Sequence, residues 1–243
     1  MRVAILSDIH GNLTALEAVL DDLEQVAPDL VVTAGDLVVN GSAPAEVLDV
    51  VRSRGWPSIQ GNTDEMLWRP ELLDDLSRRY PERHGLRRML FEHMAPATAD
   101  ALGPERLEWL RGLPKRWTSD DCAVVHAAPD NLWRAPLADA TDQELVDTYG
   151  SLGKPVLLYG HIHHGFVRSL PSLIVANCGS VSLSYDGDPR ASYAVVSEGH
   201  VELRRVAYDI DREVTRLKQS NYPFADWLGT ILKTGSYVKP PKE

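Results

Sequence analysis

The sequence predicts an α/β protein whose buried strands end in polar side chains. Residues 3–7 and 30–34 are apolar runs, and the stretch between them has leucines at helical spacing. Asp8 and Asp36 follow directly after these two predicted strands. A strand, helix and strand in succession form neighbouring parallel strands through a right-handed crossover. We therefore expect the two carboxylates to lie together at one edge of a sheet.

The elements that follow support the same fold class. Asn12 is expected to cap the first helix, and a second helix is expected over 44–53 after a Ser-Ala-Pro signal. A weak third strand is expected at 56–60. From about 65 to 112 the pattern changes to helices. We interpret this segment as a helical insertion in a single domain spanning 1–243.

Strands return after the insertion and alternate with short helices. Further strands are expected at 115–118, 122–125, 155–159, 173–176, 191–197 and 201–207. Further helices are expected near 141–149, 210–219 and 223–233.

Composition limits the classes of partner. The chain has 25 basic and 35 acidic residues, a formal net charge of −10, which argues against non-specific nucleic-acid binding. No apolar run approaches the ~18 residues that a membrane span needs. The first strand begins at residue 2, so we expect no signal peptide and a cytoplasmic location. Cys122 and Cys178 form no Cys-x-x-Cys pair and are expected to be buried free thiols. The expected partner is a small molecule, and a monomer and a homo-oligomer both stay open.

Side chains that commonly bind metals follow five of the predicted strands. They are Asp8, His10, Asp36, Asn62, His126, His161 and His163. Each one alone has an ordinary explanation, such as a turn residue or a satisfied core histidine. Together they exceed the four ligands of a closed tetrahedral site and suit two ions that share a carboxylate. Nitrogen and oxygen ligands without thiolate favour Mn²⁺, Fe, Zn²⁺ or Co²⁺ over Ca²⁺.

The order of these motifs resembles a known family. The set Asp-x-His, Gly-Asp, Gly-Asn-x-Asp, His and Gly-His-x-His is similar to that of the calcineurin-like metallophosphoesterases, over residues 1 to about 208. Residues 177–181 and 186–193 resemble a bacterial and archaeal branch of small phosphodiesterases, often labelled as related to diadenosine tetraphosphatases. The resemblance implies a four-layer α-β-β-α sandwich of two mixed sheets, with a metal pair at the strand ends.

The resemblance also implies how the ligands divide between two divalent transition-metal ions. One ion would take Asp8, His10, Asp36 and His163, and the other would take Asp36, Asn62, His126 and His161. Asp36 would bridge them. Mn²⁺ is the first choice, with Fe, Zn²⁺, Co²⁺ or Ni²⁺ as alternatives. Two ions roughly 3.5–4 Å apart can clamp the attacking and leaving oxygens of a displacement, with a shared hydroxide as nucleophile.

One residue departs from the family pattern. Many relatives carry a general-acid His between the Asn and the acid of Gly-Asn-x-Asp, and here that position is Thr63. A threonine hydroxyl has no useful pKa near 7. Asn62 and Asp64 are the other candidate catalytic residues of this motif, although Asp64 loses the His that it would orient. The missing acid favours substrates with stable leaving groups, or a proton donor from elsewhere, with His164, His84 and His93 as candidates.

The sequence thus favours a dinuclear metal-dependent phosphoesterase that hydrolyses phosphodiester bonds of small, nucleotide-type substrates. Asn12 and His164 are candidate substrate contacts. A phosphomonoesterase and a dinucleoside-polyphosphate hydrolase are the enzymatic alternatives. An alternative of another class is a metal-binding scaffold for protein partners without catalysis. An intact seven-ligand set argues against the scaffold, since a scaffold has no need of an open dinuclear site.

Overall fold

The computed structural model describes residues 1–241, in which nine strands form two mixed sheets. The four-stranded sheet has the order β2 (Leu30–Thr33), β1 (Val3–Leu6), β8 (Ala191–Ser197) and β9 (His200–Val206). The five-stranded sheet has the order β3 (Arg116–Thr118), β4 (Cys122–Val125), β5 (Val156–Tyr159), β7 (Ile174–Asn177) and β6 (Phe166–Ser169). In the four-stranded sheet the edge pair β2–β1 is parallel, and the pairs β1–β8 and β8–β9 are antiparallel. In the five-stranded sheet the central strands β4, β5 and β7 are parallel, and the edge strands β3 and β6 are antiparallel to their neighbours.

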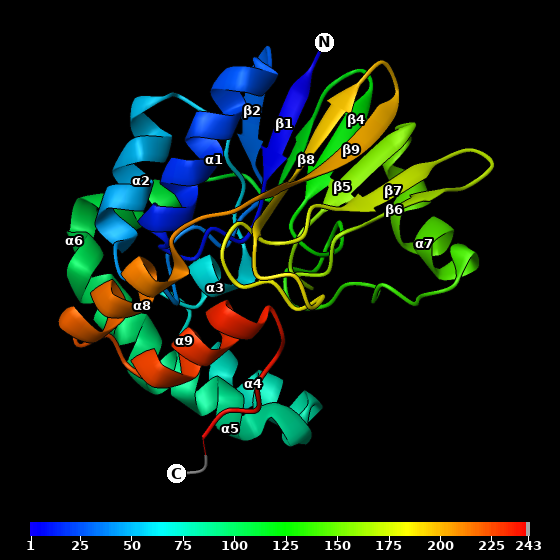
Figure 1. Ribbon diagram of the computed structural model, residues 1–243. Helices are drawn as coiled ribbons and strands as arrows, with labels where there is room; N and C mark the ends of the chain where they lie inside the picture. The colour runs from blue at the N-terminus through cyan, green and yellow to red at the C-terminus, as the bar shows by residue number, and fades with distance from the viewer. Residues whose placement is uncertain (242–243) are drawn as a thin grey trace.

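Helices cover the outer face of each sheet, so the molecule has four layers (Figure 1). The four-stranded sheet packs against α1 (Leu13–Val26), α2 (Pro44–Ser53), α6 (Ala95–Arg111), α8 (Ile210–Gln219) and α9 (Ala225–Thr234). The five-stranded sheet packs against α7 (Asp142–Tyr149), which runs into a 3₁₀ turn over Gly150–Leu152. This arrangement confirms the predicted fold class.

The alternation of side chains along the strands explains the layers. Val3 and Ile5 of β1 point into the core between the two sheets, whereas Ala4 and Leu6 pack against the helices. Val124 of β4 likewise faces the core between the sheets, and its neighbours in the strand face α7. Strands buried on both faces must be apolar throughout, as these are. Their ends are therefore the first places where polar side chains can stand.

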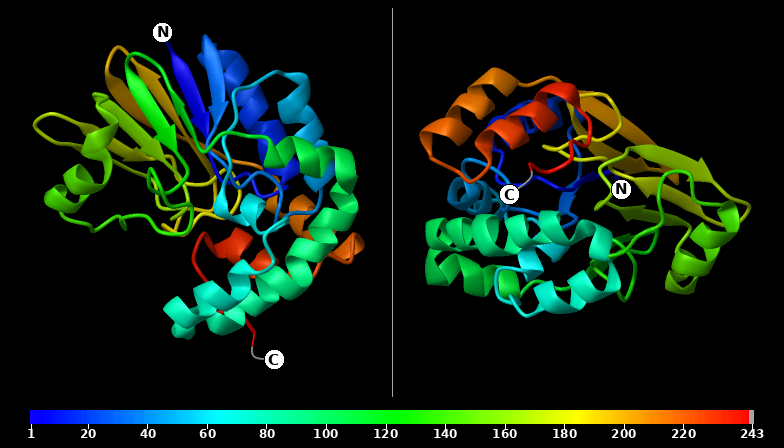
Figure 2. Two further views of the ribbon diagram at one scale, coloured as in Figure 1. Left: turned by 180° about the vertical axis from the view of Figure 1, so that it is seen from behind. Right: turned by 90° about the horizontal axis from the view of Figure 1, so that it is seen from below.

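The segment from 62 to 111 contains helices and turns without a strand. It comprises α3 (Asn62–Glu65), α4 (Leu72–Arg79), a 3₁₀ turn (Pro81–Arg83), α5 (His84–Arg88), a π-helical stretch (Met89–Met94) and α6. Helices α4 and α5 lie beyond the ends of the strands, near the C-terminal segment (Figure 1). Seen from below, this segment and helices α8 and α9 form two neighbouring groups (Figure 2).

Two sequence expectations need correction. The third strand predicted at 56–60 is reduced to a single bridge between Thr33 and Ser58, where Pro57 has no N–H to extend a ladder. Strand β6 was not predicted, because it is a short edge strand whose residues alternate between half-buried and exposed. Cys122 and Cys178 are buried and free, as expected. No helix within residues 1–241 is long and apolar enough to cross a membrane.

Candidate metal centre

The backbone is unusual at the strand ends that carry the predicted ligands. Asp8, His10, Asp36, His161 and His163 all adopt positive φ values between 51° and 66°. This left-handed region is sparsely populated by residues other than glycine, and it costs energy that functional sites often carry. Each of these turns follows directly after a buried strand, and it directs the side chain toward the shared edge of the two sheets. Within residues 1–241, five of the ten non-glycine residues with positive φ are predicted ligands.

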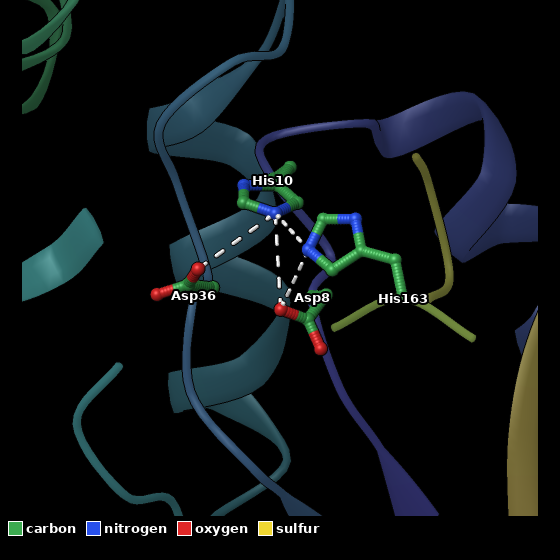
Figure 3. Close-up of side chains that lie close together, drawn as sticks. All are labelled: Asp8, His10, Asp36 and His163. Carbon is green, nitrogen blue, oxygen red and sulfur yellow. Dashed lines mark hydrogen bonds and ion pairs between the residues drawn. The ribbon is translucent and has the colours of Figure 1, made fainter. Parts of the chain in front are cut away.

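Four of the predicted ligands form a first compact group, drawn in Figure 3. The group consists of Asp8, His10, Asp36 and His163, whose candidate ligand atoms lie within 4.8 Å of one another. His163 Nε2 is 3.0 Å from Asp8 Oδ1, and His10 Nε2 is 3.8 Å from Asp36 Oδ2. All four side chains are buried. The four residues of this cluster thus come from the turns that follow three strands, β1, β2 and β5.

The three remaining predicted ligands form a second group on the other side of Asp36. Asn62 Oδ1 lies 2.8 Å from His126 Nε2 and 2.7 Å from His161 Nδ1. His126 Nε2 is also 3.5 Å from Asp36 Oδ1. Asp36 therefore faces the first group with one carboxylate oxygen and the second group with the other. The structure brings together all seven residues that the sequence predicted as ligands.

The hydrogen bonds of the imidazoles test whether these residues fit metal ions. In three histidines the Nδ1 atom meets a backbone carbonyl oxygen, which can only accept. These pairs are His10 with Val39 at 2.7 Å, His126 with Ala34 at 2.8 Å and His163 with Leu183 at 2.6 Å. The proton of the neutral ring must then sit on Nδ1, so each Nε2 presents a lone pair to the cluster. His10 Nε2 and His163 Nε2 face each other at 3.2 Å. Two lone pairs at this distance call for a cation between them, so the donor set fits divalent metal ions.

The pKa values of two predicted ligands, Asp8 and His161, are shifted in the directions that favour metal binding. Burial favours the neutral acid, yet in the metal-free protein a protonated His163, through its charge and its hydrogen bond, holds the pKa of Asp8 well below its usual range. Burial lowers the pKa of His161 to about 3, and the neighbouring His126 adds to this effect. At neutral pH Asp8 is therefore ionised and His161 is neutral, which are the states that bind metals.

Asp64 has a positioning role that sequence reasoning missed. Its Oδ2 accepts hydrogen bonds from the backbone N–H groups of Asp36 and Gly61, each at 2.9 Å, and its Oδ1 accepts one from Leu37 at 3.0 Å. Asp64 thereby fixes the turn that carries the shared ligand. Burial, with the charge of Asp36, raises the pKa of Asp64 to about 7. The available signal was its place as third residue of α3, where an acid bonds back to the residue before the helix.

The other candidate residues have different surroundings. Thr63 is buried beside the ligands, and its N–H donates to Asp36 Oδ1 at 2.8 Å. Its hydroxyl has no hydrogen-bond partner within residues 1–241. Asn12 caps α1 as predicted by accepting from the N–H of Ala15, and its amide group donates to Ser182. Asn12 is fully buried, and its role as a substrate contact stays a prediction.

The histidines proposed as proton donors lie outside the two ligand groups. His164 is exposed beside the buried His163. His84 is exposed and shares a hydrogen bond with Ser77, and His93 packs edge-on against Phe224. None of the three shares a described hydrogen bond or ion pair with a metal-ligand candidate.

Comparison with known proteins gives the family. The model of the calcineurin-like phosphoesterase superfamily domain matches residues 1–199. The chain belongs to this superfamily. The family resemblance inferred from the motif order is therefore confirmed, and with it the coarse activity of a phosphoester hydrolase.

Individual relatives extend the similarity over nearly the whole chain. An uncharacterized protein of Methanocaldococcus jannaschii is 29% identical over 96% of this chain and 98% of its own length. The crystal structure of a metallophosphoesterase from Sphaerobacter thermophilus is 28% identical, covers 97% of this chain and 100% of its own, and has a TM-score of 0.76. A hypothetical protein of Pyrococcus horikoshii shares the fold, with a TM-score of 0.82 at 21% identity over 98% of this chain and 99% of its own. The similarity thus includes the segments that follow the last metal-ligand candidate.

Proposed function

We propose that this calcineurin-like phosphoesterase is a dinuclear metal-dependent phosphodiesterase acting on small, nucleotide-type substrates. The observation that carries the proposal is the position of Asp36. One of its oxygens faces the group of Asp8, His10 and His163, and the other faces the group of Asn62, His126 and His161. A carboxylate that faces two donor sets in this way is suited to hold two cations side by side.

The ligands divide between the two ions as the family resemblance implies. When bound, such ions supply Lewis-acid stabilisation of the phosphoryl oxygens and a nucleophilic water at neutral pH. The protein's own contribution is to fix the donor atoms. Asp64 holds the turn of Asp36, and the backbone carbonyls hold three imidazole rings in the tautomer that exposes Nε2. Asn62 adds a ligand oxygen without a negative charge that would repel phosphate.

The preference for diesters over monoesters rests on Thr63. Its hydroxyl is buried beside Asp36 and can donate a hydrogen bond, but it is not an acid near pH 7. General acid assistance is worth on the order of 10²–10⁴ in rate, so its absence penalises poor leaving groups. A monoester also brings an additional negative charge to a cluster that contains two carboxylates. We therefore propose diesters with stable leaving groups as the better substrates.

The proposal is tested with chelator-treated protein reconstituted with Mn²⁺, Fe²⁺, Zn²⁺, Co²⁺ or Ni²⁺. Bound metal is counted after desalting, and turnover is measured on p-nitrophenyl phosphate and on bis(p-nitrophenyl) phosphate. We expect about two ions per chain, because the two proposed sites share Asp36, and we expect faster turnover of the diester than of the monoester. Full activity with a single ion would overturn the dinuclear proposal. Two bound ions without turnover of any phosphoester would favour the metal-binding scaffold instead.

A further inference from the structure

A cavity of about 500 Å³ opens beside the candidate metal centre. His161, a predicted ligand, lines it together with the adjoining Ile162. Tyr185, another lining residue, stacks on the ring of His163 with 4.6 Å between ring centroids and 17° between planes. The cavity is therefore lined by one ligand of the second group, and it borders the first group through Tyr185. A substrate whose phosphoryl group reaches the metal centre would place its remaining parts here.

Three distant segments of the chain form the other walls. The insertion contributes the stretch from Tyr80 to Arg87, and the loop after β4 contributes the stretch from Trp133 to Leu137. The segment after α9 contributes Tyr237, whose ring meets that of Tyr185 edge-on at 5.7 Å. These segments lie below the strand ends in Figure 1. The walls therefore belong to the parts of the chain that surround the sandwich, not to the strands that carry the ligands.

Four residues with tyrosine or tryptophan rings line this cavity. Two residues outside the cavity lining hold Trp133 in place. Its ring stacks on that of Phe91 with 5.7 Å between ring centroids, and its indole N–H donates to Glu65 at 2.8 Å. Tyr185 is held in the same way by His163. Tyr80 and Tyr237 add two further rings. Fixed rings of this kind bind flat aromatic groups at a low cost in conformational entropy.

Arginines give the cavity a positive charge in an otherwise acidic protein. Arg83, Arg87 and Arg134 line it, against the single carboxylate of Glu82. Arg87 has a structural role, since it is buried and donates to the carbonyl oxygens of Leu76 and Tyr80. Arginine side chains bind phosphate oxygens through paired N–H donors.

The other two arginines are available for a ligand. Arg83 and Arg134 are exposed, and within residues 1–241 their side chains make no ion pair or hydrogen bond. Arg134 lies close enough to Glu144 to help lower the pKa of that carboxyl group, whose main hydrogen bonds come from Thr141. The cavity is therefore lined by two arginines whose side chains, within residues 1–241, make no ion pair.

Building on the proposed function, we infer that this cavity binds a nucleoside group that carries a second phosphate, on the non-reacting side of the scissile phosphoester. The base lies among the rings of Trp133, Tyr185 and Tyr237, and the second phosphate is bound by Arg83 and Arg134. The preferred substrates are accordingly nucleotide diesters with an additional terminal phosphate. Simple aryl or alkyl diesters contact only the metal centre, because they have no nucleoside or second phosphate to place in the cavity.

Three substrates with one leaving group test this inference. They are methyl p-nitrophenyl phosphate, thymidine 5′-(p-nitrophenyl phosphate) and thymidine 3′-phosphate 5′-(p-nitrophenyl phosphate). In each, a water oxygen bonds to phosphorus, the bond to the p-nitrophenyl oxygen breaks, and p-nitrophenolate departs with the electron pair while a proton goes to solvent. We expect kcat/KM to rise about tenfold with the nucleoside and about tenfold again with the 3′-phosphate, as charge-assisted hydrogen bonds allow.

Variants assign these gains to the named residues. The double variant Arg83→Gln, Arg134→Gln should remove the gain from the 3′-phosphate, and Tyr237→Ser should reduce the gain from the nucleoside. Arg78→Gln is the matched control, because Arg78 is an exposed arginine of the same insertion that pairs with Asp75 outside the cavity. Titration calorimetry of thymidine 3′,5′-bisphosphate into metal-free protein adds a measurement that needs no turnover, and the double variant should bind it about tenfold more weakly.

The outcomes separate the two proposals. If the metal-loaded protein hydrolyses methyl p-nitrophenyl phosphate but shows no gain with the nucleoside or the 3′-phosphate, the inference about the cavity is wrong and the proposed function stands. Equal losses on all three substrates in the arginine double variant would also overturn the inference. If no substrate is hydrolysed, the proposed function fails, and the calorimetric comparison alone decides whether the cavity binds the bisphosphate.

Discussion

Replacing Gly61 by alanine should disable one half of the candidate metal centre. The backbone at Gly61 is extended, with φ −104° and ψ 174°, so alanine is free to adopt it. A Cβ atom there would stand 2.1 Å from Asp36 Oδ1 and 2.2 Å from Asp36 N. To reach a separation of 3.0 Å the carboxylate oxygen would have to move by about 0.9 Å. Overpacking of this kind costs about 1–3 kcal/mol of folding free energy, and a displacement of ~1 Å costs about 10²-fold in rate.

The displaced oxygen is the one that faces His126, and the backbone nitrogen of Asp36 must move as well, so both ions should be affected and the one beside His126 more strongly. Calorimetric titration of Gly61→Ala with Mn²⁺ should show one strongly weakened site and one less weakened site, with turnover of an aryl diester about 10²-fold lower. Gly85→Ala is the matched control, because a Cβ there meets nothing within 4 Å, and alanine should stabilise α5 by about 0.5–1 kcal/mol. Two sites of wild-type affinity in Gly61→Ala, with turnover within about threefold of wild type, would refute the steric argument.

Three further outcomes follow from the site. Asp36→Ala should retain fewer Mn²⁺ ions after desalting than His10→Ala, because Asp36 faces both donor groups; equal retention would show that it does not bridge. Thr63→His should flatten the dependence of rate on leaving-group pKa and favour monoesters more than diesters, whereas an unchanged slope would mean that another group supplies the proton. In metal-free protein, burial lowers the pKa of His161 from 6.5 to about 3. The unfolded chain then binds the additional proton, so the contribution of His161 to the free energy of unfolding should fall as pH decreases through this range, whereas the raised pKa of Asp64 acts with the opposite sign in wild type and variant alike. That fall should be smaller in His161→Asn, as urea titrations at several pH values can measure.

The ligand set could be predicted from the sequence because the order of the strands in the sheets places most of the ligands. Asp8 and Asp36 follow neighbouring parallel strands, and His126 and His161 follow another parallel pair, so strand order alone brings them to two facing edges. The prediction needed only the apolar runs and the polar residues at their ends. It did not need the loop conformations, since six of the seven ligands stand within a few residues of a strand and Asn62 follows the single bridge at Ser58.

The features that were missed depend on contacts between segments or on edges with little apolar character. Strand β6 lies at a sheet edge, where half of its residues are exposed, so the period of two carries little hydrophobic signal. The expected strand at 56–60 satisfied the hydrophobic pattern but contains Pro57, which limits pairing to one bridge. Asp64 was considered only as the partner of an absent His. Two of its three backbone hydrogen bonds come from Asp36 and Leu37 in the turn after β2, which no local pattern reveals, and only the third, from Gly61, follows from its place in α3.

The cavity could not be predicted for a related reason, and this reason bears on substrate choice. Arg83, Trp133 and Tyr237 come from three segments that no strand pairing places together, so only the folded chain shows that they share a wall. The metal-ligand candidates, by contrast, are anchored to the sheets. The proposed reaction chemistry and the proposed substrate recognition thus depend largely on different parts of the chain, with His161 common to both. Substitutions in the insertion or after α9 can then alter which phosphoester is accepted while the donor atoms around Asp36 stay in place.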